Sequence, residues 1–185
     1  TLGKDYLKPE VPLLLIRQGK DIYSTIRQAY QALMKNTEAA DLKSRTAKEY
    51  FEAFRYLGWC TWEHYHDDIN ESKIINDMKT IEASGIPIRY VLIDDGHLAH
   101  KNRQLTGFIP DKQRFPSGWK KIMSYKKENK IKWIGLWYSL SGYWMGLSPE
   151  NGFPQVVRQA LYPHAGSLLP GTDSTRIRSF YRYYV

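Results

Sequence analysis

The sequence predicts an α/β fold built on a parallel sheet, and three apolar runs are the main indication. The runs are nearly continuous in aliphatic and aromatic residues, and they cover residues 56–62 (YLGWCTW), 88–94 (IRYVLID) and 131–138 (IKWIGLWY). Parallel strands have this composition because both of their faces are covered by other parts of the fold. Segments with helical spacing separate the runs. This alternation of strand and helix is typical of parallel βαβ units.

The residues ahead of the first run predict one helix and a polar connection. Residues 1–18 show no regular spacing of apolar residues. Asp21 is suited to cap a helix that continues to about Met34, because the apolar residues after it recur at helical spacing. Residues 35–50 are polar, and we expect them to connect this helix to the first strand, with a second short helix reaching Phe54.

Two helices are predicted between the strands and one after them. Residues 70–84 carry an apolar stripe, and Gly85 fits the position just past a helix end. Residues 115–127 form the second predicted helix. Residues 139–171 are rich in Gly and Pro and are expected to be an irregular excursion. A last helix is predicted to start near Asp173.

Three strand–helix units predict the N-terminal half of a TIM (β/α)8 barrel. A complete barrel of this kind occupies about 250 residues. Residues 56–185 have room for strands 1–3 with their helices, so we expect a partial catalytic domain there. Residues 1–55 are then a helical linker that leads into the barrel.

Candidate binding residues follow the predicted strands. Asp94 and Asp95 end the second run, Trp62 closes the first and Trp137 lies at the end of the third. Ligands of α/β folds bind at the carboxyl ends of parallel strands. Adjacent side chains start on opposite faces of a strand, so both carboxylates can meet one ligand only if the chain bends, which Gly96 permits. Indole rings and carboxylates at one edge would suit the C–H faces and hydroxyls of a sugar.

Structural roles are the alternatives for these residues. The Asp pair could cap a helix in the following loop, because Asp favours turns and caps. Trp59 and Trp133 are expected in the core, since large aromatic side chains are mostly buried.

Composition excludes some classes of protein. The 42% hydrophobic content is ordinary for a globular domain, and the formal charge of +8 arises from Lys and Arg that are mixed with acids along the chain. We therefore expect no nucleic-acid partner. Cys60 is the only cysteine, so an internal disulfide is impossible. No signal peptide and no apolar run of 18 residues occurs, so no membrane partner is predicted. The sequence carries no signal for a compartment or an oligomeric state.

A metal-dependent hydrolase is a second interpretation of the strand ends. His64 and His66 form an H-x-H pattern after the first strand, and His97 and His100 follow the second. An H-x-H pattern with nearby Asp could bind a divalent metal that activates water. There is neither an HExxH motif nor a Cys pair, so histidines as ordinary polar residues are favoured, and we expect no metal and no cofactor. Cys60 is expected to be a small buried residue.

At these residues the chain resembles a known family. The segments GWCTWEHYH (58–66), IRYVLIDDGH (88–97), RFPSGW (114–119) and IGLWYSLSGYW (134–144) are similar to the raffinose synthase and seed-imbibition-protein branch of glycoside hydrolase family 36. That branch includes alkaline α-galactosidase-like and galactosyl-transferring enzymes. The similarity covers about residues 20–185, and its motifs occur in the family's order.

The resemblance implies a (β/α)8 catalytic barrel and an oligosaccharide partner, an α-galactoside. It implies that Trp62, Asp94, Asp95 and Trp137 bind the sugar. In the family a Trp follows the D-D-G motif, where this chain has His97.

The resemblance also places the catalytic pair elsewhere. The family's nucleophile belongs to a K-x-D motif on the fourth strand, and this chain has no K-x-D before Val185. Nucleophile and acid/base are thus expected beyond Val185, and the 185 residues alone should be inactive. We expect a fragment of a retaining α-galactosidase-like hydrolase. Galactosyl transfer of the raffinose synthase type and a non-catalytic carbohydrate-binding module are the alternatives.

Overall fold

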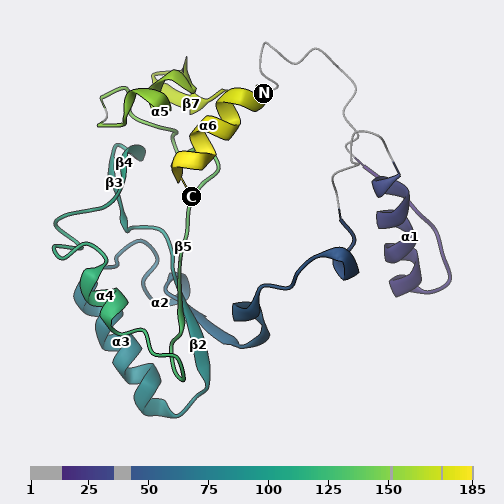
Figure 1. Ribbon diagram of the computed structural model, residues 1–185, viewed down its shortest axis with the longest axis horizontal. Helices are drawn as coiled ribbons and strands as arrows, with labels where there is room; N and C mark the ends of the chain where they lie inside the picture. Colours follow the sequence, from purple (N-terminus) through teal and green to yellow (C-terminus); the bar gives the residue numbers. More distant parts are fainter. Residues whose placement is uncertain (1–13, 36–42, 151, 172, 185) are drawn as a thin grey trace. The chain divides into compact units, whose positions relative to one another are not determined.

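The computed structural model describes residues 14–35, 43–150, 152–171 and 173–184, and Figure 1 shows its helices and strands. The chain divides into two compact units, one up to Phe51 and one from Glu52 onward. In the first unit, helix α1 spans Ile22–Met34 as predicted, and the Asp21 carboxylate caps it by accepting a hydrogen bond from the Ser24 N–H. A single 3₁₀ turn, η2, spans Arg45–Ala47. The linker prediction for residues 1–13 and 36–42 lies outside the described residues.

A three-stranded parallel sheet organises the second unit. Its strands are β1 (Leu57–Cys60), β2 (Ile88–Ile93) and β5 (Trp133–Leu136), in the order β1-β2-β5. A 3₁₀ turn, η3 (Glu52–Arg55), precedes the sheet. The predicted α/β class with a parallel sheet is confirmed. The first strand is shorter than predicted, because helix α2 (Trp62–Tyr65) begins where residue 62 was expected to end the strand.

Helices α3 (Glu71–Ser84) and α4 (Lys120–Ser124) contact each other, and both lie on one side of the sheet (Figure 1). α3 has the predicted limits: the Asn70 side chain accepts from the Lys73 N–H, and Gly85 adopts φ +74° just past its end. The prediction of a helix over 115–127 was wrong in extent. Gly118 has φ +58°, a left-handed conformation that a right-handed helix excludes, so the helix starts after it and only Lys120–Ser124 of the segment is α-helical.

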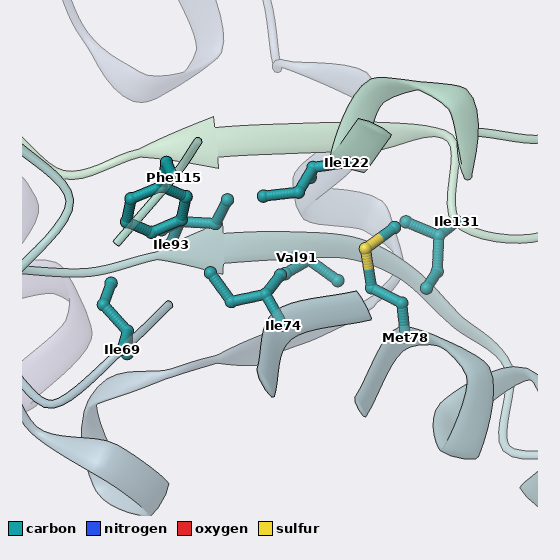
Figure 2. Packing of buried hydrophobic residues seen from close by; sticks show 8 residues of the cluster. All are labelled: Ile69, Ile74, Met78, Val91, Ile93, Phe115, Ile122 and Ile131. Atoms are coloured by element: carbon teal, nitrogen blue, oxygen red, sulfur yellow. The ribbon is translucent and has the colours of Figure 1, made fainter. Parts of the chain in front are cut away.

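The first hydrophobic cluster, called the sheet cluster below, lies between the sheet and these helices. Figure 2 shows that its side chains meet from both layers, with α3 contributing residues one turn apart and β2 contributing residues two apart. Burial of each such side chain contributes roughly 1.5–3 kcal/mol. The buried members are Ile69, Ile74, Met78, Val91, Ile93, Phe115, Ile122 and Ile131.

Two β-hairpins appear where no strand was predicted. The first joins β3 (Leu98–Lys101) to β4 (Gln104–Pro110), and the second joins β6 (Leu161–His164) to β7 (Ser167–Pro170). The second hairpin shows that the expectation of an irregular excursion over 139–171 was wrong in part. A short helix, α5 (Gln155–Gln159), also lies within that segment.

The last helix and the hairpins form a second cluster, called the hairpin cluster below. Helix α6 (Ser174–Tyr184) starts after Asp173, as predicted, and the Asp173 carboxylate accepts from the Thr175 and Arg176 N–H groups. The buried members of the cluster are Leu98, Leu105, Tyr143, Leu147, Phe153, Val157, Ala160 and Phe180. Among the described residues, no helix has the length and apolar character needed to cross a bilayer.

Candidate functional site

The carboxyl edge of the parallel sheet holds the ends of all three strands in hydrogen-bonded register. The Thr61 N–H donates to the Leu92 carbonyl (3.1 Å), and the Trp137 N–H donates to the Ile93 carbonyl (2.9 Å). The Thr61 hydroxyl accepts from the Asp94 N–H (3.0 Å). The backbone positions of Trp62, Asp94 and Trp137 therefore share one edge, which follows from the parallel direction of the strands.

Asp94 lies where β2 ends, and its side chain is partly buried. Its Oδ1 accepts from the Asp95 N–H (2.8 Å), and its Oδ2 accepts from the Cys60 thiol (3.2 Å). Burial, reinforced by the Asp94 carboxylate, raises the pKa of Cys60. Cys60 is thus a neutral thiol donor that orients Asp94, and it is only partly buried.

Asp95 has a different environment from Asp94, since only 5% of it is exposed. Its Oδ1 accepts from the Gly96 N–H (2.7 Å) and from the Tyr143 hydroxyl (2.6 Å), and its Oδ2 accepts from the Trp144 indole N–H. Burial, with this carboxylate beside it, raises the pKa of Tyr143, so the phenol stays protonated and donates. Gly96 has φ +105°, so the chain turns where the sequence predicts that glycine permits a bend.

The aromatic candidates fall into two groups. Trp137 stacks on Trp144, with ring centroids 5.5 Å apart and planes at 26°, and it meets Tyr143 edge-on. Trp62 lies on the first turn of α2, where its ring meets His66 edge-on at 5.0 Å. The structure therefore joins Asp95 to Trp137 through two aromatic side chains, whereas Trp62 and Asp94 share the edge through the backbone.

Tyr143 and Trp144 are the site residues to which the sequence analysis assigned no role. They belong to the G-Y-W part of the fourth motif (134–144), so the signal was present in the sequence. Nothing local indicates that they reach a carboxylate 48 and 49 residues earlier in the chain. Because residues 139–171 were expected to be irregular, the contact of Tyr143 and Trp144 with Asp95 was not predicted.

His97 contacts the backbone of the Asp pair. It is fully buried between Trp119 and Tyr138, with ring centroids 5.5 Å away in each case. Its Nδ1 lies 2.9 Å from the Asp94 carbonyl, which can only accept, so Nδ1 carries the hydrogen. Burial lowers the pKa of His97 despite the nearby Asp94 and Asp95 carboxylates.

The histidines of the H-x-H pattern have separate partners. His64 stacks on Tyr65 at 4.0 Å and has Nδ1 3.7 Å from Asp77 Oδ2, while His66 meets Trp62. Across the described ranges, no three His, Cys, Asp or Glu side chains come together in a way that could hold a metal ion.

A cavity of about 480 Å³ lies at the opposite, amino-terminal end of the sheet. It contains none of the predicted sugar-binding residues, and the candidate site is assigned from the chemistry of the carboxyl edge instead. The cavity is lined by Tyr56, Ile81, Glu82, Gly85, Ile86, Pro87, Ile88, Arg89, Asn129 and Lys130.

Comparison with known families shows which family the chain belongs to. The profile described as "Raffinose synthase or seed imbibition protein Sip1" matches residues 10–108, which is more than half of the chain. The chain belongs to this family. Two of its four resemblance motifs, those that contain Trp62 and the Asp pair, lie within the matched residues.

Two curated relatives from plants illustrate the similarity. The probable galactinol–sucrose galactosyltransferase 6 of Arabidopsis thaliana is 25% identical over 88% of this chain and 24% of its own length. An α-galactosidase of Oryza sativa subsp. japonica is 32% identical over 46% of this chain and 21% of its own length. The chain spans about a quarter of the length of these relatives.

Solved structures share the fold of this family member. A variant of the GH36 α-galactosidase AgaA from Geobacillus stearothermophilus, in complex with stachyose, matches 86% of this chain and 21% of its own with a TM-score of 0.51 and 18% identity. Another variant, in complex with raffinose, matches 70% of this chain and 19% of its own with a TM-score of 0.50 and 21% identity. At these identities the likeness concerns the fold.

Proposed function

We propose that residues 56–185 are the N-terminal half of a (β/α)8 barrel and hold part of the sugar site of a retaining enzyme that acts on α-galactosides. The observation that carries this proposal is that Trp62, Asp94 and Trp137 follow three neighbouring parallel strands at one edge. The order β1-β2-β5 is the order that the first three strands of such a barrel would have. Residues 1–55 would be the linker that leads into this half barrel.

The chemistry of the edge suits a galactose residue. A carboxylate accepts hydrogen bonds from sugar hydroxyls, and a charged acceptor makes these bonds stronger than a neutral one does. Asp94 is partly buried and is oriented by Cys60, which fits a fixed acceptor. The indole faces of Trp62 and Trp137 offer apolar surfaces for the C–H face of the ring.

The two carboxylates are binding or positioning groups in this proposal. Retaining glycosidases need two carboxyl groups about 5–5.5 Å apart on opposite sides of the scissile bond. Asp94 and Asp95 follow each other on one strand, and both oxygens of Asp95 already accept hydrogen bonds from the protein. We therefore assign the nucleophile and the acid/base to residues outside this chain.

Galactosyl transfer is the second candidate, and the names of the relatives favour it. Three of the curated relatives from Arabidopsis thaliana are described as probable galactinol–sucrose galactosyltransferases. Transfer and hydrolysis differ in whether a sugar hydroxyl or water attacks the galactosyl intermediate. Product analysis with and without sucrose distinguishes them: a new trisaccharide supports transfer, and free galactose alone supports hydrolysis.

The binding test uses the longest natural protein that contains these residues. Asp94→Asn is expected to weaken galactose binding roughly 10- to 150-fold in calorimetry, because a hydrogen bond to a charged group contributes about 1.5–3 kcal/mol. Glu150→Gln is the control, since that exposed carboxylate pairs with Lys101 and lies outside the candidate site. Unchanged galactose affinity in the Asp94 variant would contradict the assignment.

The catalytic part of the proposal has its own assay. The 185-residue chain is expected to release no detectable product from an aryl α-galactoside, while the longer protein does. Turnover by the 185 residues at the rate of the longer protein would show that a catalytic pair lies within them, and the proposal would then be wrong.

A further inference from the structure

Asp95 connects the sheet to the loop that carries Tyr143 and Trp144. Its carboxylate is 5% exposed and accepts from the Tyr143 hydroxyl, the Trp144 indole N–H and the Gly96 N–H. A carboxylate with these three donors has little capacity left for a ligand. Asp94, one residue earlier, is more exposed, and from the described part of the chain it accepts a thiol and one backbone N–H. The adjacent carboxylates thus have different tasks.

Trp144 extends the aromatic surface outward from the sheet edge. Half of it is exposed (50%), although its indole N–H is fixed by Asp95 and its ring stacks on Trp137. An exposed large aromatic residue held in one orientation loses little conformational entropy when it contacts a ligand. Trp144 therefore offers a preformed contact just beyond the position assigned to the galactose ring.

Arg103 stands beside this indole at the tip of the first hairpin. Its guanidinium lies 5.5 Å from the Trp144 ring centroid, and its carbonyl accepts from the Met145 N–H (2.9 Å). Asn102 and Arg103 form the two-residue turn between the paired residues Lys101 and Gln104, with φ of +53° and +59°. The second position of such a turn favours glycine.

The backbone of Arg103 therefore has a conformation that glycine would adopt with less strain. Strained residues that persist in a fold are concentrated at functional sites. The guanidinium is exposed, carries several N–H donors in a fixed fork and is always charged, so it can donate to sugar hydroxyls.

We propose that Trp144 and Arg103 form an outer sugar subsite, which takes the ring attached to galactose, and that Asp95 is the positioning residue that holds it in place. This inference rests on the proposed function and deepens it. The ligand class is an α-galactoside with at least one further sugar ring. Its second ring contacts the indole of Trp144, and its hydroxyls accept from Arg103.

The experiment measures competition against an aryl α-galactoside by two sugars, methyl α-galactoside with one ring and raffinose with three, in the longest natural protein that contains these residues. Arg103→Gly is the main variant. It is expected to weaken the binding of raffinose about 2- to 10-fold, which is the effect of one or two hydrogen bonds. The affinity for methyl α-galactoside should change much less. Arg103→Gly is also expected to raise Tm, since glycine relieves the positive φ.

Opposite changes in Tm and raffinose affinity distinguish a ligand contact from a structural role. Lys101→Gln is the matched control, because it removes one positive charge from the same hairpin, and it should leave the ratio of the two affinities unchanged. Trp144→Phe, like Arg103→Gly, should weaken the binding of raffinose more than the binding of methyl α-galactoside.

The positioning role of Asp95 has a separate readout in near-ultraviolet circular dichroism of the 185-residue chain. Asp95→Asn and the milder Tyr143→Phe should both alter the indole bands, whereas Asp94→Asn should preserve them. Unaltered bands in both of the first two variants would overturn the role of Asp95.

The outcomes separate the two levels of the proposal. If methyl α-galactoside competes but neither Arg103→Gly nor Trp144→Phe changes the affinity for raffinose, the outer subsite is refuted and the proposed function stands. If neither sugar competes, the proposed function fails and the subsite fails with it.

Discussion

The sheet cluster and the hairpin cluster differ in how far apart in the sequence their partners lie. The sheet cluster packs α3 and α4 onto strands that directly precede or follow them, and each of its elements except the full length of α4 was predicted. The hairpin cluster joins residues from Leu98 to Phe180 across two hairpins and two helices. The candidate site takes Asp94 from the first region and Trp144 from the second. Its geometry therefore depends on both regions, and the Asp95 carboxylate is one of the groups that connect them.

The largest expected effect comes from breaking the sheet cluster. Phe115 is 1% exposed and packs against Trp119 with centroids 5.2 Å apart. Phe115→Ala should lower the free energy of unfolding by about 3–5 kcal/mol, because it leaves a cavity in the core. Urea unfolding followed by far-ultraviolet circular dichroism measures it. Met123→Ala, at a position 45% exposed, should change the value by less than about 0.5 kcal/mol. Equal effects of the two substitutions would contradict this account of the core.

The hairpin cluster should be nearly as sensitive at its centre. Leu147 is fully buried and exchanges two backbone hydrogen bonds with Leu168, both 2.8 Å. Leu147→Ala is expected to cost about 2–5 kcal/mol and to change the near-ultraviolet signal of Trp144. Leu140→Ala, at a position 80% exposed, serves as the reference. If unfolding of the Leu147 variant remains a single transition, the two clusters unfold together; two transitions would show that they are independent.

A smaller effect is expected from the buried carboxylate that ties α3 to the start of α4. Glu71 is 4% exposed and accepts from the Ser117 N–H and the Lys121 ammonium, each at 3.0 Å. Burial alone would raise the pKa of Glu71, but these donors outweigh it and the pKa is lowered. Glu71→Gln should destabilise the fold by about 1–3 kcal/mol. Thermal unfolding measures it, with Glu150→Gln as an exposed control, and a loss no larger than that control would refute the role.

The same carboxylate has a consequence for acid stability. Because the folded-state pKa of Glu71 lies below the unfolded value of 4.5, its contribution is present above pH 4.5 and is lost as the pH falls through the lowered pKa. In Glu71→Gln, the free energy of unfolding measured by urea titration should fall less steeply below pH 4.5 than in the unchanged protein.

The smallest predicted effect is a pH dependence at His97, which packs between Trp119 of the sheet cluster and Tyr138 of the hairpin cluster. Burial lowers its pKa below the unfolded value of 6.5. Its contribution to stability is therefore complete above pH 6.5 and decreases as the pH falls from 6.5 toward the lowered pKa, by less than about 1.4 kcal/mol per pH unit. Urea unfolding at pH 7.5 and at pH 5.5 measures the difference in the free energy of unfolding. His97→Phe should make this difference smaller. A wild-type free energy of unfolding that stays constant over that window would contradict the prediction.

Local signals were sufficient for α1, α3 and the three parallel strands. The cap at Asn70, the apolar stripe and Gly85 all act within one helix, so the limits of α3 follow from neighbouring residues. The hairpins were missed because their turns, Asn102-Arg103 and Ala165-Gly166, lack the first-choice Asn-Gly or Asp-Gly pair. The helix over 115–127 was overestimated because Pro116 suits a first helical turn, whereas Gly118 adopts a positive φ and the helix starts only at Lys120.

Local sequence patterns were enough for the three parallel strands, for α1, α3 and α6, for the family, and for the presence of carboxylates and indoles at the strand ends. These follow from periodicity, caps and motifs that act over a few residues. The difference between the enclosed Asp95 and the more open Asp94 arises in the tertiary structure, because donors to Asp95 come from Tyr143 and Trp144 on a loop distant in sequence. Two adjacent and identical side chains cannot be told apart by local pattern; the partners that folding brings to each of them set their difference.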